Sequence, residues 1–229
     1  MIQIFLNTYE VFLQAAFLTF KLTLTSLLLG SIIGLVFAFF RISSSKWLNA
    51  LASIYIGIIR GTPLIVQIAI LYFGIASIIT LSQFWAGALA LAVHNGAYIA
   101  EVFRGSIQSV DRGQMEAGRS LGMSYALTMK EIILPQAFKR SIPPLGNQFI
   151  IGLKDSSLVA YVGMAELWGS GLSEAAANYR QLETYIVIGL YYLVMVLFIS
   201  FILRKVESRL DVDSVPKERF IKEENVQAL

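Results

Sequence analysis

The chain contains a run of forty residues, 61–100, without a single Asp, Glu, Lys or Arg. Residues 22–40 form another charge-free apolar block, and residues 185–203 form a third. A helix needs about 20 mainly apolar residues to cross a bilayer, so each block is long enough to be a membrane span. Only 14% of all residues are charged, whereas a soluble domain carries roughly 25%. The sequence therefore predicts an integral membrane protein.

The order of apolar and polar segments predicts an all-α, polytopic membrane helical bundle with five transmembrane helices. Its transmembrane domain is expected at residues 1–210, with spans at about 15–40, 50–79, 84–107, 138–165 and 185–204, a polar loop at 108–135 and a charged cytoplasmic tail at 211–229. The first block lacks a preceding basic segment and a cleavage site, so we expect an uncleaved span. The second block is too long for one straight crossing. Either part of it lies in the interface, or its helix is broken between Arg60 and Pro63.

The distribution of basic residues predicts how the spans are oriented. Of the 18 Lys and Arg residues, 14 fall after the first span, in the polar loop or in the tail. Lys21 and Arg180 fall on the other side, while Arg60 and Lys154 lie within predicted spans. Basic residues accumulate on the cytoplasmic side of membrane proteins. We therefore expect an external N-terminus, a cytoplasmic C-terminus and a cytoplasmic loop at 108–135.

Several classes of chemistry are disfavoured by composition. The chain has no cysteine and one histidine, His94, so a thiolate or histidine-based metal site is not expected. It contains no G-x4-G-K-[ST] loop, which argues against nucleotide binding by this chain. No nucleophile–base pair is suggested, so we expect neither an enzyme nor a bound cofactor. The basic residues are dispersed between apolar blocks, which favours a topological role over binding of nucleic acid.

Charged residues inside predicted spans are the candidates for a substrate pathway, because each costs about 2.5–3.5 kcal/mol at a helix centre unless it is paired or hydrated. Arg60 precedes Gly61, Thr62 and Pro63, and a helix break there would place a cation beside freed backbone groups, as suits a carboxylate. The alternative is a kink near the interface, with Arg60 reaching lipid phosphate. Lys154, Asp155 and Ser156 interrupt the fourth span; the alternative to substrate recognition is a structural ion pair with another span.

The third span carries a further polar group. Asn95, Tyr98 and Glu101 follow one another at three-residue spacing, which places them on one helical face. Glu101 also precedes Arg104 by three residues, so a local ion pair is the simpler interpretation. His94 is interpreted as a packing or hydrogen-bonding residue. An amino acid carries both charges, and a cavity that combined Arg60 with Asp155 or Glu101 would suit it. Gly30 and Gly34 in the first span have the spacing of a close helix contact.

The polar segment 116–135 reads EAGRSLGMSYALTMKEIILP and is rich in helix-forming residues. Gly122 is expected to end a first short helix, and Pro135 to fix the entry into the next element. The spaced residues are Glu116, Ala117, Gly118, Gly122, Ile132, Leu134 and Pro135. This pattern resembles the cytoplasmic "EAA" signature of permease subunits of bacterial ABC importers, with Gly118 where alanine is usual. Residues 60–63 (RGTP) and 134–137 (LPQA) resemble the branch that takes up polar amino acids.

The resemblance, which covers about residues 19–209, implies a type I ABC importer permease fold in the bacterial cytoplasmic membrane. It implies that the segment forms a coupling helix that docks on an ABC ATPase subunit, which would bind ATP and Mg²⁺. The coupling residues would be Glu116, Ala117, Gly118, Arg119 and Gly122. It also implies a second permease copy, identical or paralogous, and an extracytoplasmic amino acid-binding protein delivering substrate near residues 166–183. Glutamine, cystine and basic or acidic amino acids are all compatible substrates.

Other functions remain open at the level of sequence. An ion-coupled secondary transporter would use Glu101 or Asp155 as its ion site, although no inverted repeat is evident. An ABC permease for another small polar solute, such as a peptide, sugar or oxyanion, would differ little in composition. A scaffold or a membrane enzyme would leave the charges within the spans without a purpose.

Overall fold

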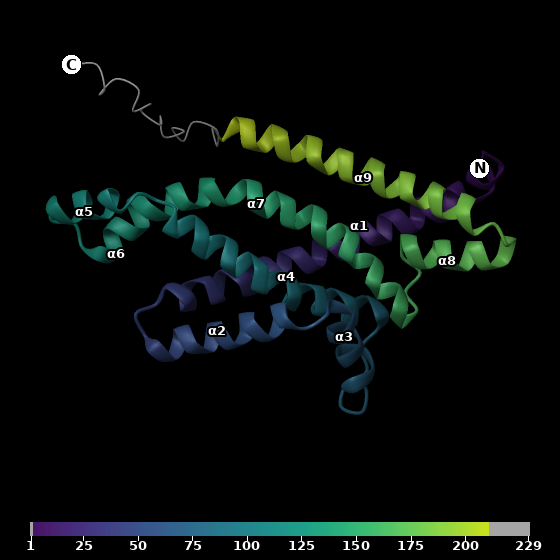
Figure 1. Cartoon of the computed structure of the whole chain (residues 1–229), viewed down its shortest axis with the longest axis horizontal. Helices are drawn as coiled ribbons and strands as arrows, with labels where there is room; N and C mark the ends of the chain where they lie inside the picture. Colours follow the sequence, from purple (N-terminus) through teal and green to yellow (C-terminus); the bar gives the residue numbers. More distant parts are fainter. Residues whose placement is uncertain (1, 211–229) are drawn as a thin grey trace, which may run out of the picture.

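The computed structural model describes residues 2–210, and these residues form an elongated, entirely helical molecule (Figure 1). The predicted tail at 211–229 lies outside the described residues. The helices are α1 (Ile2–Ile42), α2 (Lys46–Gly61), α3 (Leu64–Ala69), α4 (Gln83–Gln108), α5 (Arg112–Ser120), α6 (Tyr125–Thr128), α7 (Leu134–Asp155), α8 (Leu167–Asn178) and α9 (Gln181–Arg209). Irregular turns continue three of them: π-helical turns at Ile70–Gly74 and Met129–Ile133, and a 3-10 helix at Ser156–Val162.

Helix α1 is the scaffold along which the other helices are arranged. Its 41 residues extend about 60 Å at 1.5 Å per residue, roughly twice the thickness of the hydrocarbon core. Its second half crosses α4 at Gly30 and Gly34. A Cβ atom at position 30 would lie 3.0 Å from the carbonyl oxygen of Ala92, and one at position 34 would lie 2.6 Å from Cγ2 of Ile99. The predicted small-residue contact is therefore confirmed, because only glycine permits this approach.

By length and apolarity, α1, α4 and α9 can each cross a membrane, and α2 with α3 and its π-helical turn forms a fourth candidate bent by 104°. The bend follows Gly61, so the broken-helix alternative for the second span is correct. Helix α7 does not meet the same criteria. It contains four charged residues: Lys139, Arg140, Lys154 and Asp155. The count of five spans therefore stays a prediction.

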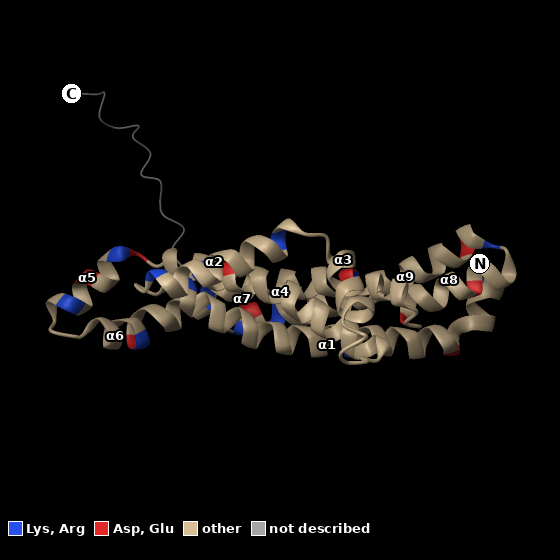
Figure 2. Cartoon of the chain, turned by 90° about the horizontal axis from the view of Figure 1, so that it is seen from below, with Lys and Arg blue, Asp and Glu red and all other residues tan. Residues whose placement is uncertain are grey.

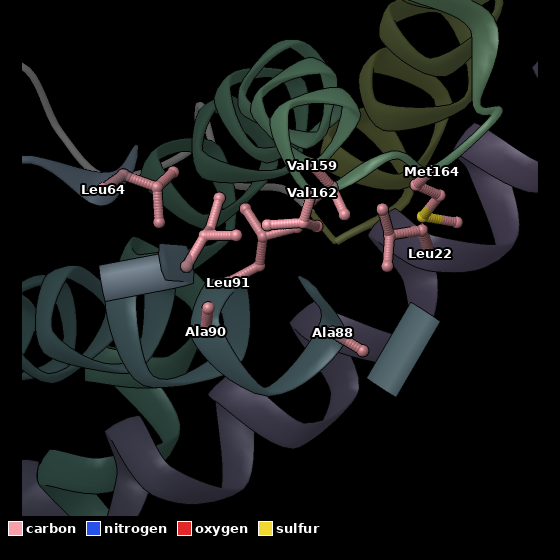
Figure 3. Close-up of a cluster of buried hydrophobic side chains, with 9 residues drawn as sticks. Leu22, Leu64, Ala88, Ala90, Leu91, Val159, Val162 and Met164 are labelled. Carbon is pink, nitrogen blue, oxygen red and sulfur yellow. The ribbon is translucent and has the colours of Figure 1, made fainter. Parts of the chain in front are cut away.

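A central core joins the bent pair to the rest of the molecule (Figure 3). Leu64 of α3 and Leu91 of α4 are buried against Val159 and Val162 of the 3-10 helix, and Leu22 of α1 joins them. A Cβ atom at Gly87 of α4 would lie 2.5 Å from Val159. The 3-10 helix that follows α7 and the start of α3 after the helix break thus pack against the same part of α4.

The exposed side of α9 and the ends of the molecule differ in polarity. The outward row on α9 is apolar, with Leu190, Val194, Leu197 and Phe201 all exposed. Their spacing puts them on one side of the helix, as expected for a surface that contacts lipid. Charged residues gather at the ends: in Figure 2 most blue lies between α5 and the middle of the molecule, and red predominates near α8.

Candidate functional site

Helix α5 carries four of the predicted coupling residues, with Gly122 just after it, and has well-defined ends. Asp111 caps its N-terminus, with Oδ1 accepting a hydrogen bond from the Gly113 amide at 2.6 Å. At its C-terminus the Met123 amide donates to the Gly118 carbonyl and the Gly122 amide to the Arg119 carbonyl, each at 3.1 Å. This is a Schellman motif, which needs a left-handed residue after the helix. Gly122 supplies it with φ +84°, so the predicted helix end at Gly122 is confirmed.

Gly118 lies on the inner side of α5, against α6. A Cβ atom at position 118 would lie 2.6 Å from Cγ2 of Thr128 and 3.0 Å from its Oγ1. Thr128 is fully buried and donates a hydrogen bond to the Ser124 carbonyl at 3.0 Å. Ser124 in turn accepts from the Leu127 amide at 3.2 Å and caps α6. The glycine that departs from the EAA pattern is therefore matched by a threonine that fills the space beside it.

The outer side of the same segment is exposed. Glu116, Ala117 and Arg119 are exposed, and the guanidinium of Arg119 donates to the Met123 carbonyl at 3.0 Å. Large apolar side chains accompany them, with Leu121 83% and Tyr125 57% exposed. These two side chains lie beside charged residues rather than in the apolar band of the molecule. Such a mixture of apolar and charged groups suits a protein partner.

The module of α5 and α6 is fixed to the long helices. Val110, Ile133 and Ala137 are buried in one apolar cluster at its base. The guanidinium of Arg140 on α7 donates to the Ser109 carbonyl at the end of α4. Pro135 is the second residue of α7 and directly follows the π-helical turn at Met129–Ile133, so it lies where the α-helix resumes. The predicted role of Pro135 at the start of an element is therefore confirmed.

Three of the predicted intramembrane residues, Arg60, Thr62 and Tyr98, lie at the α2–α3 break. The guanidinium carbon of Arg60 lies 5.2 Å from the centroid of the Tyr98 ring on α4. Thr62 donates from Oγ1 to the Ile58 carbonyl at 2.9 Å. Arg60 and Thr62 are both exposed, and Tyr98 is half-buried. Arg60, Thr62 and Tyr98 are therefore brought together, as a shared pathway would require.

Two members of this group were not anticipated as site residues. Gln67 donates from Nε2 to the Ile59 carbonyl and to Oγ1 of Thr62, both at 2.9 Å. Its Oε1 lies 3.1 Å from Nδ1 of His94. The polar Gln67 inside an apolar run was the only signal in the sequence. The hydrogen-bonding role expected for His94 is confirmed.

Asn95 and Glu101 do not join the group, although their spacing predicted a face shared with Tyr98. Asn95 is completely buried and accepts at Oδ1 from Nε2 of Gln148 on α7, at 2.8 Å. Glu101 binds the Arg104 guanidinium, at 2.7 Å to Nη2, and lies 3.7 Å from Nε of Arg41. The local ion pair expected for Glu101 is confirmed, and Asn95 instead packs α4 on α7.

Lys154, Asp155 and Ser156 lie where α7 passes into the 3-10 helix. Lys154 is exposed, Asp155 is half-buried and Ser156 is buried, with its hydroxyl donating to the Leu153 carbonyl at 2.7 Å. Within residues 2–210, neither charge forms an ion pair. The expected combination of Arg60 with Asp155 or Glu101 is not formed as a direct contact.

A buried acid at the start of α8 was also missed. Glu166 is 0% exposed and accepts hydrogen bonds from the Gly169 amide at 2.7 Å and the Tyr192 hydroxyl at 3.0 Å. Oγ1 of Thr19 lies 3.3 Å from the same carboxylate and accepts from the Leu167 amide at 3.0 Å. Burial raises the pKa of Glu166, although these donors oppose the shift. The sequence placed it in an ordinary polar segment.

No cluster of three or more potential metal ligands occurs among the residues that the structure describes.

The chain is similar to known proteins over most of its length. The family model for "Binding-protein-dependent transport system inner membrane component" matches residues 27–212. The glutamine transport system permease protein GlnP of Escherichia coli K12 is 38% identical over 203 residues, covering 87% of this chain and 93% of that protein. The L-cystine transport system permease protein TcyB of Bacillus subtilis is 39% identical, covering 84% and 83%.

Solved structures agree with this relationship. A chain from the crystal structure of an amino acid ABC transporter with histidines is 41% identical and superimposes with a TM-score of 0.85, covering 89% of this chain and 96% of that chain. A chain of the inward-facing MetNI methionine ABC transporter is 18% identical, with a TM-score of 0.79 over 89% of this chain, and shows the same fold.

Proposed function

The chain belongs to the family of binding-protein-dependent transport system inner membrane components, and from that membership we propose that it is the permease subunit of an ATP-driven importer of polar amino acids. The match over residues 27–212 to this family carries the proposal. Relatives named for transport of glutamine, arginine and cystine support the substrate class. This chain supplies the substrate pathway and the helices that transmit the ATPase motion to it. ATP with Mg²⁺ is bound by separate ATPase subunits.

The α5–α6 module is the proposed ATPase dock. Its exposed face combines Glu116 and Arg119 with Leu121 and Tyr125. Its inner face is packed tightly, so a push on α5 passes directly to the start of α7. Docking here would make this end cytoplasmic and the N-terminus external, and the excess of basic residues at this end supports that orientation. The external binding protein then approaches α8 at the opposite end.

The α2–α3 break is the proposed pathway. Arg60 lies fourteen residues after Lys46, so it is about 21 Å along α2 from the cytoplasmic end. An exposed guanidinium at that depth costs about 2.5–3.5 kcal/mol against lipid. We therefore assign the face with Arg60, Thr62 and Tyr98 to an aqueous path shared with a second permease copy. Lys154, Asp155 and Ser156, at the end of α7, are assigned to the same path.

Purification from native membranes in mild detergent tests the proposal. The expected result is co-purification of a P-loop ATPase, and uptake of radiolabelled L-glutamine, L-arginine or L-cystine into proteoliposomes that stops when ATP is withheld. Isolation of the chain alone, together with uptake that follows an ion gradient instead of ATP, would contradict it. That second outcome would indicate a secondary transporter. The pairing of Glu101 with Arg104 argues against Glu101 as an ion site.

A further inference from the structure

The break between α2 and α3 creates a local deficit of hydrogen bonds. Pro63 has no amide hydrogen to donate, and the chain turns by 104° instead of continuing the helix. The last carbonyls of α2 therefore need other donors. Thr62 donates to the Ile58 carbonyl at 2.9 Å, and Nε2 of Gln67 donates to the Ile59 carbonyl at 2.9 Å. Gln67, four residues beyond the proline, thus caps the helix that precedes it.

These contacts also fix which way the Gln67 amide points. Its Nε2 faces three acceptors: the Ile59 carbonyl and both the hydroxyl and the carbonyl of Thr62, the last at 3.2 Å. Only a nitrogen can donate to them, so Oε1 must be the atom that faces His94. Nδ1 of His94, 3.1 Å away, therefore carries the proton. The His94 ring becomes a donor that holds α3 on α4.

One face of α4 therefore contacts residues on both sides of the break. His94 binds Gln67, which follows the break, and Tyr98 lies under the guanidinium of Arg60, which precedes it. The His94 and Tyr98 rings are themselves 5.1 Å apart. The bend angle and the place of Arg60 are thus set from α4. Among residues 2–210, Arg60 forms no ion pair, and the Tyr98 ring is its one cation-π partner.

We propose that Gln67 and His94 are positioning residues of the transport pathway, a latch that holds the α2–α3 break on α4 and so presents the Arg60 guanidinium to the carboxylate of the amino acid in transit. This inference rests on the proposed function. The latch itself does not touch the substrate. Its loss lets the break relax, and Arg60 then leaves the position where it can accept the substrate from the external side.

The test measures transport and ATP hydrolysis separately in proteoliposomes containing the complete complex with its binding protein. The probe is whichever of L-glutamine, L-arginine and L-cystine the unaltered complex imports. Gln67→Leu and His94→Leu are each expected to lower the number of amino acids imported per ATP by about tenfold, the factor for one lost buried hydrogen bond. The double variant should be no worse than Gln67→Leu alone, because Gln67→Leu already removes the bond to His94 together with the cap on α2.

Two controls separate positioning from simple damage. His94→Asn keeps an N–H donor at the place of Nδ1 and should restore most of the ratio. Gly57→Ala, in α2 with nothing within 4 Å of the new Cβ, should leave the ratio unchanged. A latch variant that lowers uptake and ATP hydrolysis in equal proportion overturns the proposal, and so does His94→Asn behaving like His94→Leu. If the unaltered complex imports no amino acid, the proposed function fails instead.

Discussion

Glu116 and Glu166 occupy equivalent positions in the sequence and opposite environments in the structure. Each lies on a short polar helical segment between apolar blocks. Glu116 is exposed and makes no hydrogen bond or ion pair within residues 2–210. Glu166 is fully buried and is bound from α1, α8 and α9. The difference is that this chain itself surrounds and binds the acid of the α8 segment, whereas the acid of the α5 segment lies at the surface of the described residues.

Removing the buried acid should have the largest effect on stability. In Glu166→Leu, the Gly169 amide and the Tyr192 hydroxyl lose their acceptor inside the protein, at about 1–3 kcal/mol each. We expect the midpoint of thermal unfolding in detergent to fall by roughly 6–12 °C. Glu166→Gln keeps an acceptor for the amide and a partner for the hydroxyl, so its midpoint should fall by less than half as much. Equal losses in the two variants would show that the hydrogen bonds do not anchor α8.

Reversing the exposed acid should spare stability and abolish function. In Glu116→Lys, no internal bond is lost, so the unfolding midpoint should stay within about 2 °C. If the proposed dock is correct, the new charge faces the ATPase, and both ATPase co-purification and uptake should fall by tenfold or more, about 1.4 kcal/mol. Glu183→Lys reverses the charge of an acid in the first turn of α9, where the carboxylate pairs with Arg180 at 3.0 Å, and it should leave ATPase binding intact. Normal co-purification and uptake in Glu116→Lys would remove the docking assignment.

The difference between these two acids could not be read from the sequence. Local signals succeeded where the structure depends on neighbours in the chain: Gly122 ends α5, Pro135 lies in the first turn of α7, and the second span is broken after Gly61. Glu166 lies 3.3 Å from the hydroxyl of Thr19, which is 147 residues away in the chain. Gln67 finds His94 across 27 residues. Spacing within one helix predicts a shared face but not what packs against it: Asn95 binds Gln148 of α7, whereas Tyr98 lies under Arg60 of α2.

The exposed apolar side chains of the α5–α6 module should respond to substitution as Glu116 does. Leu121 and Tyr125 are 83% and 57% exposed, so truncation removes little packing within this chain. If they are anchors in an ATPase groove, Leu121→Ala and Tyr125→Ala should each weaken ATPase binding by roughly tenfold. Their unfolding midpoints should again stay within about 2 °C. Titration of the detergent-solubilised permease with purified ATPase measures the first effect. A lowered midpoint with unchanged affinity would make these residues part of the fold.

Gly118 combines features of both regions: it belongs to the exposed helix α5, but it is buried on the side of that helix that packs against α6. In Gly118→Ala, the new Cβ meets Thr128 Cγ2 at 2.6 Å, so one of the two must move by several tenths of an ångström. The gain in helix propensity, about 1 kcal/mol, offsets most of that strain. We therefore expect a fall of only about 1–3 °C in the unfolding midpoint. Adding Thr128→Ser removes the methyl group and should return the midpoint to the original value or above it. If the double variant is no more stable than Gly118→Ala alone, the contact with Thr128 does not set the place of α5, and the rigidity assigned to this end must come from the cluster at its base.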